Sequence, residues 1–279
     1  MDYRNLYRKK LISVEDAVAK VNSEDQIVTG LGCGGATAFL EKLAERKDEL
    51  KDVVIHQMLP LYNYRYFQPG METSFCHNSW FNSAYTRNLV NEKRADFTPN
   101  FFHESPGFFR NYHEINILVA VVSPMDRHGY FSFGLSVDYT KPVAEHADLV
   151  ILEVNGGMPR TLGDSFIHIS EVDYLIESNY PIPELPVSEP DEAELKIGEY
   201  VAELVEDGST LQLGIGGILN AVTASLTGKK DLGIHSEMLT DGMVDLVEKG
   251  VINNRMKTLH KGKIIGSFAA GTRRLYDFL

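Results

Sequence analysis

The sequence predicts an α/β fold, in which short strands alternate with helices along most of the chain. Runs of β-branched residues alternate with stretches whose apolar residues recur at helical spacing. Two runs, Ile115–Pro124 and Asp148–Asn155, are apolar almost throughout, which is typical of parallel strands buried on both faces. The same alternation begins again after a proline-rich segment near residue 180, so we expect two α/β domains rather than one.

The first half of the chain supplies most of these elements. Ser13, with Asp16 three residues later, resembles the capping box that opens a helix. Residues 62–106 are rich in aromatic residues, asparagine and proline, and their pattern predicts no element. The other expected elements, in order, are a helix through Val21, a strand over 26–31, a helix over 37–50, a strand over 52–59, a turn within 126–134 and a short helix over 141–147.

A linker separates the two halves. Residues 179–194 contain four prolines and a cluster of acidic residues, which excludes regular structure for most of that length. We therefore place a domain boundary at residue 188, with domains at 1–188 and 189–279. The second half then predicts helices over 191–205, 219–226 and 243–249, and strands over 210–213, 232–237 and 263–268.

Composition excludes several classes of protein. The formal net charge is −12, and a nucleic-acid or membrane-surface binder would need a basic face, so we expect neither partner. The two cysteines, Cys33 and Cys76, are too few for a disulfide framework and fit a reducing cytosol. The charged N-terminus lacks the apolar core of a signal peptide, and no apolar run approaches the roughly 20 residues of a membrane helix. A cytoplasmic protein is the expectation.

The first glycine-rich turn, GLGCGG at residues 30–35, formally matches the dinucleotide-binding fingerprint. That motif also requires an acidic residue about 20 positions later, at the end of the second strand. The strand over 52–59 ends instead in His, Gln, Met and Leu. We therefore interpret the turn as a tight strand-to-helix connection and expect no NAD or FAD.

Common catalytic constellations are not apparent. The nine histidines and two cysteines show no metal-ligand spacing, and no G-x-S-x-G motif of a serine hydrolase is found. Cys76 and His77 are neighbours, but adjacent side chains of an extended segment point to opposite faces. The sequence thus predicts neither a metal site nor a Cys–His pair.

A second glycine turn and a nearby carboxylate are the remaining candidates. Gly214, Gly216 and Gly217 precede a helix, where glycine lets the backbone approach a ligand; a purely structural turn is the other interpretation. Glu237 lies at the end of an expected strand about 20 residues later, the length of one β-α-β step, so the two strand ends can be neighbours. Its carboxylate can be a nucleophile or base, or can cap the following helix.

Several long motifs, in the same order, resemble the acetyl-CoA hydrolase/transferase family. The resemblance implies two similar CoA-transferase-type α/β domains, a CoA-binding loop formed by Gly214, Ile215, Gly216, Gly217 and Ile218, and a covalent glutamyl-CoA thioester at Glu237. Leu219 and Ser236 stand where relatives usually have proline and threonine, and neither change removes a functional atom. The motifs are LQLGIGGILNAV, KDLGIHSEMLTDGMVDLVEKGVIN, HGYFSFGLSVDYTK, ILEVNGGMP, IHISEVDYLIE and MDYRNLYRKKLIS.

The resemblance also implies the reaction and its partners. It predicts transfer of CoA between a short-chain acyl-CoA, such as 4-hydroxybutyryl- or butyryl-CoA, and a carboxylic acid such as acetate. CoA is then a substrate, and no cofactor is permanently bound. Hydrolysis of the acyl-CoA is the nearest alternative. A homo-oligomer, most simply a dimer, is expected.

Chain length departs from the family pattern. Members resemble this chain throughout but continue beyond it, and a further glycine-rich loop of the family lies in that continuation. The second domain of about 90 residues is short for a domain and ends on the apolar LYDFL. We therefore expect an incomplete second domain. A fragment that acts only with a C-terminal segment or companion chain remains a further alternative.

Overall fold

The chain, described over residues 3–279 by a computed structural model, forms two compact units that meet between Pro183 and Glu184. This division lies before the expected boundary at residue 188 because the first linker residues bond to the second unit. The Leu185 N–H donates to the Gly271 carbonyl at 2.9 Å, and the Glu184 carboxylate accepts from the Arg273 N–H at 3.0 Å. The assignment of 1–188 and 189–279 to two functional domains stays a prediction.

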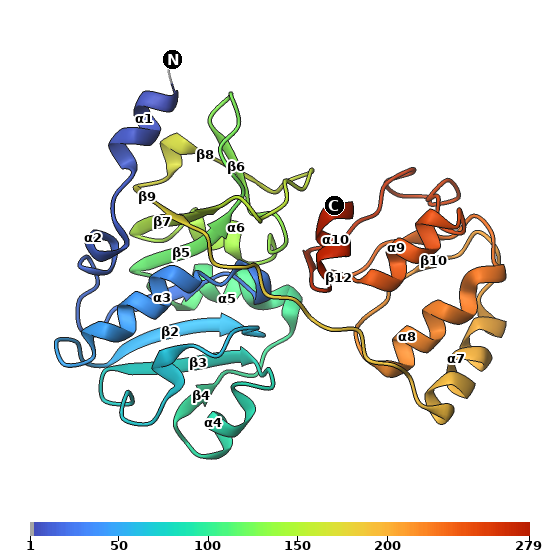
Figure 1. The fold of residues 1–279 in the computed structure, drawn as a ribbon, viewed down its shortest axis with the longest axis horizontal. Coiled ribbons are helices and arrows are strands. Elements are labelled where there is room, and N and C mark those ends of the chain that lie inside the picture. The colour runs from blue at the N-terminus through green and yellow to red at the C-terminus, as the bar shows by residue number, and fades with distance from the viewer. Residues whose placement is uncertain (1–2) are drawn as a thin grey trace. The chain divides into compact units, whose positions relative to one another are not determined.

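Unit 1 is built on a seven-stranded sheet in which every neighbouring pair is parallel (Figure 1). The order reverses between β1 and β5, which are adjacent in the sheet although β2, β3 and β4 lie between them in the chain. The strands, in their order across the sheet, are β4 (Ala95–Phe97), β3 (Phe75–Phe81), β2 (Val53–Met58), β1 (Gln26–Thr29), β5 (Ile117–Val122), β7 (Leu149–Asn155) and β9 (Tyr174–Ser178).

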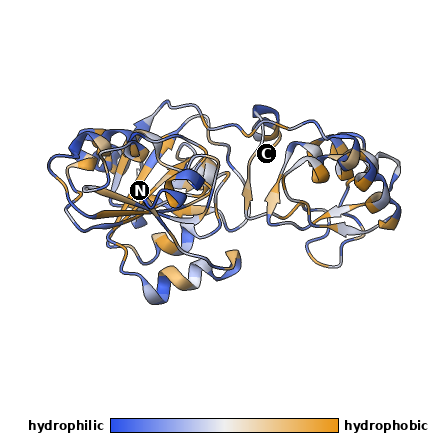
Figure 2. Ribbon diagram, turned by 90° about the horizontal axis from the view of Figure 1, so that it is seen from below, coloured by the Kyte–Doolittle hydropathy of each residue, from blue (hydrophilic) through white to orange (hydrophobic). Residues whose placement is uncertain are grey.

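The expected strands of unit 1 are confirmed, and burial explains their sequences. All six residues of β5 are buried, which requires cover on both faces of the sheet, and Figure 2 shows hydrophobic colour concentrated on these strands. One face packs on Phe39 and Leu40. The helices of unit 1 are α1 (Tyr3–Lys10), α2 (Val14–Val18), α3 (Thr37–Leu43), α4 (Arg87–Asn91), α5 (Ser105–Tyr112) and α6 (Thr140–Ala144), and β6 (Tyr130–Ser132) pairs antiparallel with β8 (Phe166–His168).

Two expectations for unit 1 need correction. The helix expected over 37–50 ends at Leu43 and continues only as a 3₁₀ turn over Ala44–Arg46. The aromatic-rich segment, for which the sequence predicts no element, contains β3, β4 and α4. Its strands were hidden because aromatic, asparagine and histidine side chains interrupt the apolar pattern while the backbone still pairs with β2.

Unit 2 combines helices with short parallel strand pairs, which completes the α/β class expected for both halves. Helix α7 begins at the expected place, with a capping box in which Asp191 accepts from the Glu194 N–H. The core of the unit contains Leu226, Leu232 and Leu246. Its elements are α7 (Glu192–Leu204), β10 (Thr210–Leu211), α8 (Gly217–Ser225), β11 (Gly233–Ile234), β12 (Met238–Leu239), α9 (Asp241–Glu248), β13 (Phe268–Ala269) and α10 (Arg273–Phe278).

The strands of unit 2 are shorter than the sequence predicts. The strand expected over 232–237 is divided into β11 and β12, with Glu237 in a bend between them. Side chains explain the division: Asn254 accepts from the Ile234 N–H at 2.9 Å, and Lys257 donates to the Ile234 carbonyl at 2.7 Å. The Asn254 side chain thus takes the place of a neighbouring strand at the Ile234 N–H, while the Ile234 carbonyl also accepts from the Ile265 N–H at 3.3 Å.

Candidate functional site

The glycine turn of unit 2 follows β10 and leads directly into α8. Gly216 precedes the helix with φ of +119°, a conformation that favours glycine. A Cβ at Gly214 or Gly216 would meet no atom within 4 Å, so the backbone there faces open space. Gly217 is different, because a Cβ at this position would meet the carboxylate of Glu194. Gly214 and Gly216 therefore leave main-chain groups accessible, while Gly217 is required by packing.

The side chains of this turn are also exposed. Ile215 and Ile218 keep 42% and 40% of their surface accessible, which is unusual for isoleucine in a domain with its own core. The structure thus places all five residues of the expected CoA-binding loop at one helix N-terminus. Such a turn offers backbone N–H groups and apolar surface to a ligand.

Glu237 lies beside this turn, and the hydroxyl of Ser236 is the contact that fixes the arrangement. Strands β10 and β11 pair in parallel, with Leu211 opposite Ile234. Two residues further on, the Ser236 Oγ donates to the Leu213 carbonyl at 2.8 Å and accepts from the Leu213 N–H at 3.1 Å. The next residues of the two segments are Gly214 and Glu237.

The side chain of Glu237 is accessible to solvent, while hydrogen bonds hold its backbone in place. The side chain is exposed, whereas its main-chain carbonyl accepts from the N–H and the hydroxyl of Ser267 at 2.9 and 2.7 Å. Its carboxylate makes no hydrogen bond or ion pair within the part of the chain that the structure describes, so it does not cap α9. That helix begins at Asp241, whose own carboxylate accepts from Thr272.

A cavity of about 240 Å³ opens close to the glycine turn. It lies at the carboxyl ends of β12 and β13, where open α/β sheets bind ligands. Ile215, Gly216 and Asn220 form one wall. Thr240 and Ala270 lie at the two strand ends, and Glu237 itself is not among the lining residues. The remaining lining residues are Leu185, Pro186, Val187, Ser188, Asp241, Gly242 and Gly271.

Lys257, a buried lysine that hydrogen-bonds to the backbone of β11, was not identified from the sequence. Lys257 is only 2% exposed, and its ammonium donates to the carbonyls of Ile234 and Lys263, both at 2.7 Å. Burial lowers the pKa of this lysine. Lys257 lies in a loop without regular structure, so no periodic pattern marks it. It fixes the segment that enters the Ser236–Glu237 bend.

The first glycine turn is structural, as the sequence interpretation expects. Residues 30–35 are all buried, and a Cβ at Gly30 would lie 2.5 Å from the Gly34 carbonyl oxygen. At Gly34 it would lie 2.6 Å from the Ser136 Cβ. Buried polar groups fix the turn: Gln57 donates to the Gly30 carbonyl at 3.0 Å. The glycines at Gly30 and Gly34 are therefore required by close packing within unit 1.

Cys76 and His77 are separated, also as expected. Both lie on β3, where Cys76 is half-buried and its thiol donates to Asp96 at 3.4 Å, while His77 is buried and contacts the Tyr66 hydroxyl at 3.1 Å. Burial raises the pKa of the Cys76 thiol to about 11, which leaves little thiolate at neutral pH. Within residues 3–279, no three His, Cys, Asp or Glu side chains gather in a way that suits a metal ion.

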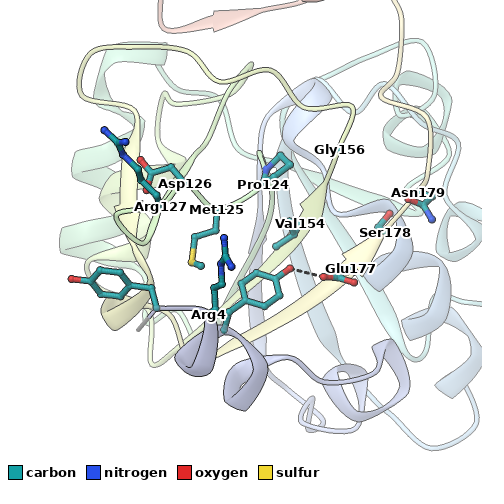
Figure 3. A pocket seen from close by; sticks show the side chains of 12 residues that line it. Arg4, Pro124, Met125, Asp126, Arg127, Val154, Gly156, Glu177, Ser178 and Asn179 are labelled. Carbon is teal, nitrogen blue, oxygen red and sulfur yellow. Dashed lines mark hydrogen bonds between the residues drawn. The ribbon is translucent and has the colours of Figure 1, made fainter. Parts of the chain in front are cut away.

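Unit 1 has a larger cavity, of about 670 Å³, that contains no residue predicted from the sequence (Figure 3). It lies beyond the carboxyl ends of β5, β7 and β9, and α1 forms one side. In Figure 3 the Arg4 side chain extends toward Met125. The two acidic side chains that line this cavity have partners within unit 1. Glu177 accepts from the Tyr7 hydroxyl at 2.7 Å, and Asp126 forms an ion pair with Arg160 at 2.7 Å.

Solved structures place this architecture among the CoA-transferase folds. RipA from Yersinia pestis superposes with a TM-score of 0.93 at 34% identity, covering 100% of this chain and 68% of that one. The 4-hydroxybutyrate CoA-transferase from Porphyromonas gingivalis gives a TM-score of 0.80 at 36% identity, covering 99% and 66% of the two chains. Residues 1–186 match the acetyl-CoA hydrolase/transferase N-terminal domain. The chain belongs to the acetyl-CoA hydrolase/transferase family.

Two curated relatives extend the comparison over the whole chain. The 4-hydroxybutyrate coenzyme A transferase of Clostridium kluyveri is 46% identical over 280 residues, which cover 100% of this chain and 65% of that protein. The succinyl-CoA:cyclohexane-1-carboxylate CoA transferase of Geobacter metallireducens is 46% identical over 277 residues, covering 99% and 63%. The chain therefore spans slightly less than two thirds of the length of these relatives. Among residues 3–279, no helix has both the length and the apolar composition needed to cross a membrane.

Proposed function

We propose that this chain carries the catalytic carboxylate of a CoA-transferase, and that Glu237 is that carboxylate. One observation supports this most directly: the two Ser236–Leu213 hydrogen bonds bring Glu237 beside the glycine turn at Gly214. The carboxylate is exposed and makes no hydrogen bond or ion pair among the described residues, so a substrate can approach it. An open backbone turn and an accessible acid at adjacent strand ends are what acyl transfer requires.

The proposed chemistry proceeds through two covalent states. The Glu237 carboxylate attacks the thioester carbonyl of an acyl-CoA; the C–S bond breaks, CoA leaves as the thiolate, and a mixed anhydride remains. The thiolate then attacks the glutamyl carbonyl of the anhydride, the C–O bond breaks, and the first acid leaves as a carboxylate. Glu237 now carries CoA as a thioester, and a second carboxylic acid reverses both steps. Each bond formed replaces one of similar energy, so no ATP is consumed.

Residues 214–218 would position the thioester and stabilise the charge that develops on its oxygen. A carboxylate is a weak nucleophile, so the enzyme must position the thioester and stabilise the negative charge that develops on its oxygen. The open N–H groups at Gly214 and Gly216 are suited to this role or to holding CoA. A single oxyanion donor is typically worth about 3 kcal/mol in the transition state.

The relatives indicate the substrate class. Their names specify 4-hydroxybutyrate, cyclohexane-1-carboxylate with succinyl-CoA, and butyrate with acetyl-CoA. We propose a short-chain acyl-CoA, such as 4-hydroxybutyryl- or butyryl-CoA, and an acid such as acetate as the reaction partners. CoA is a substrate in this scheme, and no permanently bound cofactor takes part. We place the reaction in the cytoplasm, in a homo-oligomer.

Glu237→Gln tests the nucleophile directly. The amide keeps the shape of the side chain but cannot form the anhydride, so CoA exchange between butyryl-CoA and acetate should fall by at least about 10³-fold. Borohydride reduction after incubation with butyryl-CoA should modify Glu237 in the unaltered protein alone, as measured by peptide mass spectrometry. The matched control is Glu203→Gln, an exposed glutamate on α7, which should keep full exchange.

Three results would contradict parts of this proposal. Exchange that survives in Glu237→Gln excludes the nucleophile role. Release of free CoA without an acceptor acid identifies a hydrolase instead. Inactivity of the 279-residue chain, followed by activity when the C-terminal part of a relative is added, identifies it as one piece of a larger catalytic unit.

A further inference from the structure

Three buried side chains in the interior of unit 1 each have one polar atom without a hydrogen-bond partner among the described residues. These atoms are the Oε1 of Gln57, the Nε2 of His77 and the Oγ of Ser79. The three residues are 0%, 2% and 0% exposed, so bulk solvent does not reach them. Buried polar atoms in native proteins nearly always have a partner, either a protein group or an ordered water molecule. Three such atoms therefore need a common explanation.

The three side chains lie on one face of two neighbouring strands. In the parallel pair of β2 and β3, Gln57 lies opposite Ser79, and His77 is two residues before Ser79. Paired residues, and every second residue along a strand, point to the same face of a sheet. His56 and Trp80, which alternate with these positions, contact each other on the opposite face. Because neighbouring strands are only about 4.8 Å apart, the three side chains are close neighbours.

The other polar atoms of Gln57 and His77 already have partners, which fixes the orientation of both side chains. The Gln57 Nε2 donates to the Gly30 carbonyl at 3.0 Å, so exchanging the amide nitrogen and oxygen would place two acceptors against each other. The His77 Nδ1 contacts the Tyr66 hydroxyl at 3.1 Å. Turning either side chain would give one atom a partner only by taking a partner from another atom.

The chemistry of the three atoms requires a small, uncharged group that both donates and accepts. The Gln57 oxygen only accepts, the Ser79 hydroxyl does both, and the His77 nitrogen does either according to the tautomer. Burial lowers the pKa of His77 to about 3, so its ring is neutral. None of the three groups then carries a charge that could compensate a buried cation. A water molecule fits, because it commonly makes about three hydrogen bonds in a protein interior.

We propose that a water molecule is bound between Gln57, His77 and Ser79, where it links β2 to β3. The three atoms make no direct hydrogen bonds to one another, and one water molecule can connect atoms up to about 5.6 Å apart, twice the length of a hydrogen bond. The water also supports the first glycine turn indirectly, since it holds the amide that donates to Gly30. This inference concerns unit 1 alone and is independent of the proposed function.

A crystal structure of the 279-residue chain that resolves ordered water molecules tests the proposal directly. We expect a density peak within about 3.2 Å of Gln57 Oε1, His77 Nε2 and Ser79 Oγ. Direct hydrogen bonds among the three side chains, or no density between them, would overturn the proposal. Contacts of about 2.1 Å would also overturn it, because they indicate a metal cation instead of water.

Ser79→Val tests the same site in solution. The branched side chain fills the place of the hydroxyl and removes one hydrogen-bonding group, so the water should be expelled. Oxygen-17 magnetic relaxation dispersion, which counts long-lived buried water molecules, should give one fewer than in the unaltered chain. The matched control is Ser225→Ala, whose lost hydroxyl donates to the Ala221 carbonyl at 2.9 Å within α8 and should leave the count unchanged. Equal counts in Ser79→Val and the unaltered chain would contradict the proposal.

Ser79→Ala provides a second comparison if the valine variant does not fold. It keeps the space but leaves the water with only two side-chain partners. Loss of one hydrogen bond should shorten the residence time of the water by about fivefold, measured by the same relaxation method. A residence time equal to that in the unaltered chain would show that Ser79 does not hold the water, and the proposal would fail.

Discussion

At the scale of single residues, specific partners hold two buried histidines in the interior of unit 1. The His56 ring accepts from the Trp80 indole N–H at 3.1 Å and contacts the Gln26 side-chain amide oxygen at 2.8 Å. His77 is buried beside Tyr66. Burial lowers the pKa of each histidine to about 3. Both rings must therefore stay neutral in the folded chain.

Acid should destabilise the protein through these two residues. The unfolded chain binds a proton at each histidine below about pH 6.5, whereas the folded chain does not until about pH 3. Their contribution to stability is therefore full above pH 6.5. As the pH falls through this window, each histidine removes about 1.4 kcal/mol of unfolding free energy per pH unit.

Asp138 acts in the opposite direction over part of this window. Burial raises the pKa of its carboxyl to about 7, so the folded chain holds a proton that the unfolded chain loses above about pH 3.9. The effect of Asp138 offsets that of one histidine. As the pH falls from about 6 to about 4, the free energy of unfolding of the unaltered protein should therefore decrease by about 1.4 kcal/mol per pH unit. Urea unfolding across this range should show a shallower slope in His77→Phe and a steeper slope in Asp138→Asn. Identical slopes in all three proteins would refute this account.

At the scale of elements, two turns with similar glycine content have opposite roles. The turn at 30–35 is buried, and each added Cβ would meet another atom, whereas the turn at 214–216 is open. The pattern of glycines alone does not separate these cases, because glycine serves both close packing and close approach of a ligand. The missing acidic residue after the second strand is what identifies the first turn as structural.

A pair of substitutions should separate the two roles. Gly34→Ala should lower the free energy of unfolding by about 1–3 kcal/mol, because the new methyl group meets the Ser136 Cβ. Adding Ser136→Gly should restore part of that loss, as measured by a double-mutant cycle. Gly214→Ala should change stability by less than about 0.5 kcal/mol but slow CoA exchange. A stability loss at Gly214 as large as that at Gly34 would contradict the distinction.

At the scale of the whole molecule, the sequence predicts the α/β class because buried parallel strands have a recognisable composition. β5 and β7 are continuous apolar runs, and their positions follow directly from the sequence. β3 and β4 are not recognisable, because histidine, asparagine and aromatic side chains there find partners that only the fold provides. One is the 2.9 Å hydrogen bond between Thr98 and Asn78.

For the candidate site, the residue pattern alone predicts only which strand ends lie next to each other. The spacing between the glycine turn and Glu237 predicts neighbouring strand ends, and the resemblance to the family predicts the residues. The contacts of linker residues 184–188 with unit 2 and those of Lys257 were not predictable, because both lie in segments without periodicity and involve main-chain carbonyls. Such contacts depend on three-dimensional placement alone.

The Ser236 hydroxyl has a consequence for engineering this protein. It is simultaneously donor and acceptor to one backbone unit, that of Leu213. Serine and threonine carry a hydroxyl on the β-carbon that can do both, whereas the thiol of cysteine is only a weak donor and a weak acceptor. A mutant library of this chain should therefore restrict this position to those two residues and place its diversity elsewhere.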